Sequence, residues 1–179
     1  MFFNTHETFG LISRILHWTM ALLILSLLAL GLTIADMEPS LDSLWLYGLH
    51  KSLGFVALIL VLLRLVWHRI TPPPHPLGNP AALPQRLARG AHRVIYALLV
   101  IIPMAGWVGS SATGLDTVLF NTLTLPPIAP VSEAWETTAF AVHWAATWAL
   151  MGVLGLHIAG AFARAIKGDN TLERMISGS

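Results

Sequence analysis

Long apolar stretches without strand-like alternation dominate the chain. A membrane-spanning helix needs about 20 predominantly apolar residues, and three stretches reach this length with no Asp, Glu, Lys or Arg in their apolar part. The second stretch along the chain is interrupted by Lys51 and Arg64, but it contains the apolar run 52–63. We therefore expect four spans, at about residues 15–35, 47–68, 93–114 and 138–164.

This pattern predicts an all-α fold, an integral membrane four-helix bundle that forms a single domain over residues 1–179. The first ten residues carry no Lys or Arg, and the apolar run that follows is too long for the core of a signal peptide. We expect the first span to be retained. Pro103 is expected to kink the third helix, which neighbouring helices can accommodate in a membrane.

The charges of the connections define an orientation. Segments 36–49 and 116–136 each contain three acidic residues and no base. Segment 69–93 contains four arginines and no acidic residue, and its proline cluster at 72–76 is expected to be extended. With four spans, nine of the ten Lys and Arg residues fall on one side, and Lys51 falls on the other. The positive-inside rule then predicts that both termini are cytoplasmic.

Composition supports a membrane protein and excludes several cofactors. The chain is 55% hydrophobic and 11% charged, against roughly 25% charged residues in soluble domains. Its mean hydropathy is +0.70. The chain has no cysteine, which rules out disulfides, iron–sulfur clusters and covalent haem attachment through C-x-x-C-H. The net charge of +1 gives no reason to expect a nucleic-acid partner.

Four histidines in the expected spans pair at two depths. His143 and His157 are 14 residues apart on the fourth helix, so they share nearly one face at positions about 21 Å apart along the axis. The first helix runs opposite to the second and fourth. His17 therefore lies at the level of His157, and His50 at the level of His143, whichever way the bundle is inserted.

Two stacked pairs of imidazoles favour two haems, each ligated by two histidines. Without cysteine these haems would be non-covalent and b-type. A histidine-lined path for a metal ion or protons, or unrelated polar contacts, remains open at this point. Small residues would let a flat macrocycle approach the helices, although they also serve ordinary helix packing. The candidates are Gly54, Gly106, Gly109, Gly152 and Gly155.

Several short motifs, in order along the chain, resemble the bacterial cytochrome b561 family. They are SRILHW at 13–18, GLHKSLGF at 48–55, LLRLVWHR at 62–69, AHRVIYALLVIIPMAGW at 91–107, LPP at 125–127 and KGDNTLERM at 167–175, together with the histidine pair of the fourth span. The outer segment TVLFNTLTLPP departs from the family pattern, with Asn121 where glycine is expected.

The resemblance implies a di-haem cytochrome of the bacterial inner membrane, with His17, His50, His143 and His157 as the iron ligands. Lys51, beside His50, is expected to pair with the outer haem propionates or to attract an anionic substrate. Arg14 and Arg64 are candidates for the inner propionates. The resemblance also places a quinone pocket near the inner haem, where His92 and Arg164 lie. We assign no role to His6, His68 or His75.

The expected function is transfer of single electrons between a periplasmic partner and the membrane quinone pool, with ubiquinone as the expected ligand. The outer partner is either a periplasmic redox protein or superoxide, so an enzymatic activity of superoxide oxidation coupled to quinone reduction stays open, as does a homodimer. Two alternatives remain. One is a haem-bearing membrane anchor subunit of a dehydrogenase or hydrogenase, and the other is a non-haem metal transporter.

Overall fold

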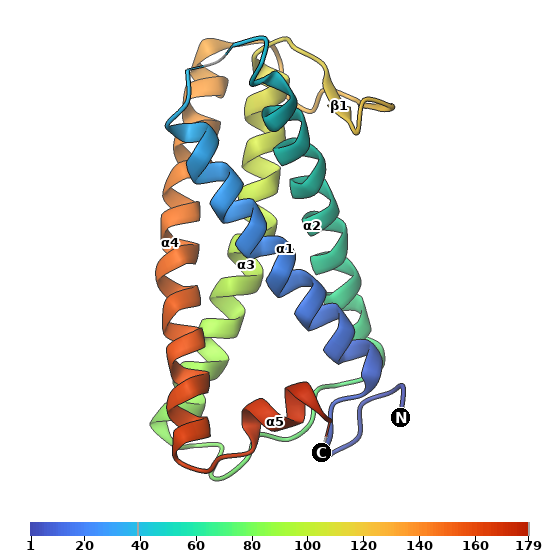
Figure 1. Cartoon of the computed structure of the whole chain (residues 1–179), viewed down its shortest axis with the longest axis vertical. Coiled ribbons are helices and arrows are strands. Elements are labelled where there is room, and N and C mark those ends of the chain that lie inside the picture. The colour runs from blue at the N-terminus through green and yellow to red at the C-terminus, as the bar shows by residue number, and fades with distance from the viewer. Residues whose placement is uncertain (39, 179) are drawn as a thin grey trace.

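The computed structural model describes residues 1–38 and 40–178, and within them four long helices form an elongated bundle (Figure 1). These helices are α1 (Leu11–Ala35), α2 (Leu44–Ile70), α3 (Leu83–Ala112) and α4 (Glu133–Ile166). A short helix, α5 (Thr171–Ile176), follows α4. By length and composition, each of α1 to α4 could cross a membrane, as the hydropathy pattern predicts.

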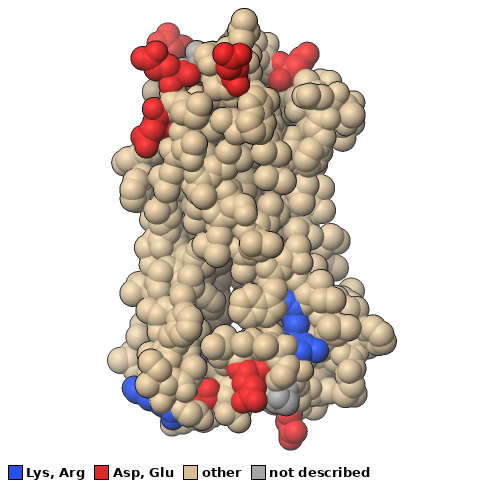
Figure 2. Space-filling model, in the orientation of Figure 1, with Lys and Arg blue, Asp and Glu red and all other residues tan. Residues whose placement is uncertain are grey.

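The chain termini and α5 lie at one end of the bundle, and a small hairpin lies at the other (Figure 1). At the hairpin end, the visible face carries acidic side chains and no Lys or Arg, whereas the Lys and Arg on this face lie in its lower part (Figure 2). We call the hairpin end the outer end and the other the inner end, following the charge asymmetry of the connections.

Helix ends explain two differences from the expected spans. α3 begins at Leu83 and not near residue 93, the expected start of the third span, whereas the proline cluster at 72–76 lies outside any helix, as expected. Pro84 lies in the first turn of α3, where its missing N–H costs nothing, and good helix formers follow it. The N-cap of α4 is Ser132, whose hydroxyl accepts a hydrogen bond from the Trp135 N–H. Glu133 and Glu136 lie in the first turn, where acidic side chains interact favourably with the helix dipole.

A two-stranded hairpin, which the sequence pattern does not reveal, closes the outer end. Antiparallel strands β1 (Thr117–Leu119) and β2 (Leu123–Leu125) meet at a tight turn. Asn121, which departs from the family pattern, has φ of 55°, a left-handed conformation that Asn tolerates better than most residues. The Phe120 N–H donates to the hydroxyl of Ser52 on α2 over 2.9 Å, so the turn is anchored two residues after His50.

The buried core lies halfway along the bundle. It consists of Met20 of α1, Leu58 and Val61 of α2, Leu99 of α3 and Leu150 of α4. α3 packs most extensively against α4, and α1 packs against α2. Among the described residues, α1 and α4 scarcely approach each other's backbone. The two helix pairs meet at this central core, and α2 also packs against α3.

Candidate haem-binding site

The four predicted histidine ligands come together in two facing pairs. At the inner end, the ring centroids of His17 on α1 and His157 on α4 are 6.5 Å apart. At the outer end, those of His50 on α2 and His143 on α4 are 6.2 Å apart. α4 thus contributes one imidazole to each pair, and α1 and α2 contribute the other two. The pairs lie on opposite sides of Leu150, which is seven residues from both His143 and His157.

The separation of each pair fits one metal ion between the two rings. An imidazole nitrogen binds a metal at about 2 Å, and this nitrogen lies about 1 Å from the centre of its ring. Two imidazoles on opposite sides of a metal therefore have centroids about 6 Å apart, which agrees with both pairs. Within residues 1–38 and 40–178, no group of three or more His, Cys, Asp or Glu is placed to hold a metal ion. The remaining ligands would have to come from the cofactor, as the four nitrogens of a haem do.

A backbone hydrogen bond orients the ring of His143, one of the predicted ligands. Its Nδ1 lies 2.8 Å from the carbonyl oxygen of Ile102 on α3. Because a carbonyl only accepts, Nδ1 carries the proton and Nε2 is left as the metal-binding nitrogen. In the opposing ring, His50, the buried Nδ1 has no hydrogen-bond partner among the described atoms. No hydrogen bond at Nδ1 therefore prevents the His50 ring from binding a metal.

Glycines pack against both outer rings. A Cβ added at Gly106 of α3 would lie 3.1 Å from Nδ1 of His143, and one added at Gly31 of α1 would lie 3.1 Å from Cε1 of His50. Gly31 was not among the candidates from the sequence. Gly109 instead packs against Phe140, an ordinary helix contact. The other three glycine candidates have no described atom within 4 Å of an added Cβ: Gly54, Gly152 and Gly155.

A cluster of polar side chains surrounds the inner pair. Nη1 of Arg64 lies 3.1 Å from Nδ1 of His17, and the Arg64 guanidinium lies over the Tyr96 ring, 5.9 Å from its centroid. His92 of α3 approaches His157 edge-on, with ring centroids 5.0 Å apart. Its Nδ1 donates to the carbonyl of Ala88 over 2.7 Å. Arg64 and His92 therefore lie beside the inner pair.

The Arg64 contact cannot persist when Nε2 of a neutral His17 binds iron. Arginine only donates, so Nδ1 of His17 accepts in this contact and Nε2 carries the ring proton. Iron binding through Nε2 requires the opposite tautomer. The inner site therefore fits a haem once Arg64 turns away from the ring.

Two other predicted cations, Arg14 and Arg164, bond to groups outside the histidine pairs. Nη1 of Arg14 donates to the carbonyl of Ile176 over 2.7 Å. Nη2 of Arg164 donates to Oε1 of Gln85 over 3.2 Å, and Nη1 of Arg164 lies 4.0 Å from an Asp169 oxygen. Lys51 is partly buried, next to His50. Gln85, which is buried, was missed because an isolated glutamine gives no sequence signal.

Four apolar helices with two imidazole pairs between them are typical of a membrane cytochrome that binds haem without covalent attachment. The comparison with known families agrees: residues 8–178 match the family model described as prokaryotic cytochrome b561, so the chain belongs to the prokaryotic cytochrome b561 family. It is 31% identical to cytochrome b561 homolog 2 of Escherichia coli strain K12, covering 99% of this chain and 96% of that protein. It is 25% identical to the probable superoxide oxidase CybB of Yersinia pestis, covering 96% and 97%.

Family membership establishes the general function. The protein is a multi-pass protein of the bacterial inner membrane that binds b-type haem and transfers electrons, in a family that interacts with quinones. The residues at the two histidine pairs fit such a cofactor by type and by spacing.

Proposed function

We propose that the protein carries two b-type haems and passes single electrons between the membrane quinone pool and a partner in the periplasm, with both termini in the cytoplasm. The observation that supports this most directly is the duplication of the facing histidine pair at two depths of one bundle. A single haem would need only one pair. Two pairs on opposite sides of a buried core supply a relay from one face of the membrane to the other.

The proposed ligands are His17 and His157 for the inner haem and His50 and His143 for the outer one. Haem held by these histidines would supply one-electron chemistry. Two imidazoles for each haem would also leave the protein side of the site without a free position for oxygen. The core of Met20, Val61 and Leu150 would keep the space between the haems dry.

His92 and Arg164, at the inner end, would serve quinone chemistry. A quinone exchanges two electrons and two protons, so a one-electron relay must act twice per quinone. His92 can hold or release a proton beside His157, whereas Arg164 stays charged and can only donate hydrogen bonds. We assign His92 a role in proton exchange and Arg164 a role in hydrogen bonding to a quinone oxygen. We assign Arg14 and Arg64 the inner propionates, since Arg64 lies beside His17 and Arg14 is three residues before it in α1.

Superoxide is a candidate outer substrate. One relative is named a probable superoxide oxidase, and Lys51, the only base expected on the outer side, neighbours His50. A lysine beside the outer haem would attract an anion or pair with a propionate. The acidic residues of the outer end act against anion capture, so a soluble redox protein remains the competing outer partner.

Haem quantification tests the proposal. The protein would be purified in mild detergent after expression with ample haem supply. A pyridine haemochrome assay with protein quantification is expected to give two b haems per chain, and ubiquinol is expected to reduce both under anaerobic conditions. Protein without haem would overturn the proposal and would favour a role of the histidines in metal or proton transport. One haem per chain would overturn the relay.

A further inference from the structure

The two ligands of the proposed inner haem lie on helices that do not pack against each other. α1 carries His17 and α4 carries His157, and their backbones scarcely meet among the described residues. The inner pair nevertheless has the spacing that one metal requires. α2 and α3 link α1 to α4 through their packing, and α5 lies between α1 and α4 across the inner end (Figure 1).

α5 is bonded to α1 through its last carbonyl groups. The Trp18 Nε1–H donates to the carbonyl of Met175 over 2.9 Å, and Arg14 donates to the carbonyl of Ile176. The last carbonyls of a helix have no partner within the helix, so side chains of α1 satisfy groups that would otherwise need water. Both donors lie within one turn of His17.

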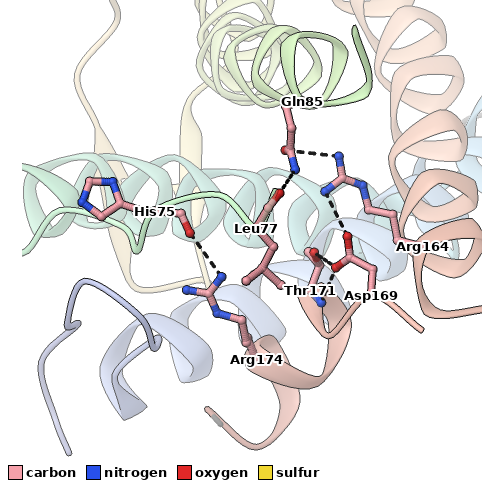
Figure 3. A network of polar contacts seen from close by, with 7 residues as sticks. All are labelled: His75, Leu77, Gln85, Arg164, Asp169, Thr171 and Arg174. Carbon is pink, nitrogen blue, oxygen red and sulfur yellow. Dashed lines mark hydrogen bonds and ion pairs between the residues drawn. The ribbon is translucent and has the colours of Figure 1, made fainter. Parts of the chain in front are cut away.

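On its other side, α5 is tied to α4 and to the inner connections. Asp169 accepts from the hydroxyl and the N–H of Thr171 and lies near Arg164 of α4. Arg174, which is buried, donates to the carbonyls of His75 and Glu7. Figure 3 shows Arg164 of α4 joined to Gln85 and Asp169, Asp169 joined to Thr171 of α5, and Arg174 of α5 joined to His75 in the connection before α3. α5 is therefore fixed with respect to α4 before it reaches α1.

Trp18 connects α5 to the haem ligand itself. Its ring meets the His17 imidazole edge-on, with centroids 5.1 Å apart and an angle of 79° between the planes. Its Nε1–H is held by α5. A tryptophan whose far edge is fixed restricts the rotation of the histidine plane that it touches.

We propose that α5 braces the inner haem site and that Trp18 is a positioning residue that sets the ring plane of His17. The proposal rests on the proposed function, because it assigns a role toward the inner haem. It predicts an asymmetry between the two sites: the outer pair is held by α2, α3 and the hairpin, so disturbing α5 alters the inner haem alone.

Two variants test the brace in the full membrane protein. Trp18→Phe keeps an aromatic ring beside His17 and removes the N–H donor, and a stop codon after Asp169 removes α5. The matched control is Trp135→Phe, an exposed tryptophan at the outer end. The measurements are haem content, the low-spin ferric EPR signals of the two haems, and haem transfer to excess apomyoglobin.

For Trp18→Phe we expect two haems per chain, a shifted or broadened EPR signal from the inner haem, and haem loss from the inner site roughly threefold faster, as the loss of one hydrogen bond implies. Truncation is expected to lower the content from two haems to one. The control is expected to match the wild type. If the truncated chain fails to accumulate, Trp18→Phe decides the question.

The brace would be overturned if Trp18→Phe left the inner EPR signal and the haem-loss rate unchanged, or if both haems changed equally. Two haems per chain in the wild type would still support the proposed function in that case. Fewer than two haems in the wild type would overturn the proposed function and the brace with it.

Discussion

The Nδ1 nitrogen of His143 donates to the carbonyl oxygen of Ile102 over 2.8 Å. This bond connects α4 to α3 at the residue before Pro103, and it fixes which nitrogen of the ring faces the proposed outer haem. Hydrogen bonds to the outer nitrogen of a metal-bound histidine commonly set its orientation and basicity. The packing of α3 against this ring therefore determines the geometry of the outer site.

Gly106→Ala tests this packing. The added Cβ would lie 3.1 Å from Nδ1 of His143, so the ring must shift and its bond to Ile102 weaken. Alanine favours a helix over glycine by about 1 kcal/mol, so a weakened helix cannot explain the change. We expect altered EPR of the outer haem alone. Gly160→Ala, at an exposed and open position, is the control, and an unchanged outer signal in Gly106→Ala would contradict this prediction.

Single ligand replacements separate the two haems. His143→Leu is expected to remove the outer haem and keep the inner one, and His157→Leu is expected to do the reverse, because each iron loses one of two axial ligands. Haem content should fall from two to one in both variants, with different EPR signals retained. His75→Leu, whose ring stacks on His6 outside the spans, should keep both haems. Loss of both haems, or of neither, in the ligand variants would rule out the pairing.

Arg64→Gln is expected to lower the midpoint potential of the inner haem. A fixed positive charge favours ferrous haem, which carries one positive charge fewer than ferric haem. At an effective dielectric constant near 20 we expect an effect of about 1.4 kcal/mol, or roughly 60 mV for one electron. Redox titration measures the shift, and Arg69→Gln on the exposed side of α2 serves as the control. A potential that is unchanged, or that changes equally at both haems, would place Arg64 away from the inner haem.

The contacts of Asp169 with Thr171 and Arg164 should be insensitive to pH until strongly acidic conditions. Partial burial acts to raise the pKa of Asp169, but the hydrogen bonds from Thr171 and the charges of Arg164 and Arg174 outweigh it and lower the pKa below 3.8. A depressed carboxyl pKa stabilises the fold in full above the unfolded value, and this stabilisation is lost as the pH falls through the folded value.

Limited proteolysis of the C-terminal segment measures this dependence. Cleavage should be slow and constant between about pH 5 and 8 and should accelerate below about pH 4. Asp169→Asn should be cleaved faster at neutral pH, without the acid transition, whereas Glu173→Gln, at an exposed position, should behave like the wild type. An acid transition retained in Asp169→Asn would assign it to another group.

Most of what can be predicted from the sequence, the four helices and the matching of the histidines, follows from hydropathy and helix order. Apolar length defines the four helices, and alternating helix direction is enough to match His17 with His157 and His50 with His143. Both are properties of whole segments, and they do not depend on individual side-chain contacts.

The remaining features depend on contacts that leave no pattern in the chain. The carbonyl of Ile102 is invisible in a sequence, because every residue has one. Gly31 lies against His50 only because α1 crosses α2 there, and the hairpin strands are three residues long, too short for alternation to show. The early start of α3 was missed because prolines and arginines hide a helix that continues beyond the apolar span.

The separation of 14 positions between His143 and His157 would also couple the proposed relay to the membrane potential. An electron that moves between the two levels travels about 21 Å along the helix axis, which is roughly two thirds of a hydrocarbon layer about 30 Å thick. A full crossing against 100 mV costs about 2.3 kcal/mol per charge, so this step costs or yields roughly 1.5 kcal/mol. Electron transfer toward a negative cytoplasm is opposed by the membrane potential, and electron transfer away from the cytoplasm is favoured by it. The membrane potential would therefore bias the direction of electron transfer in the proposed relay.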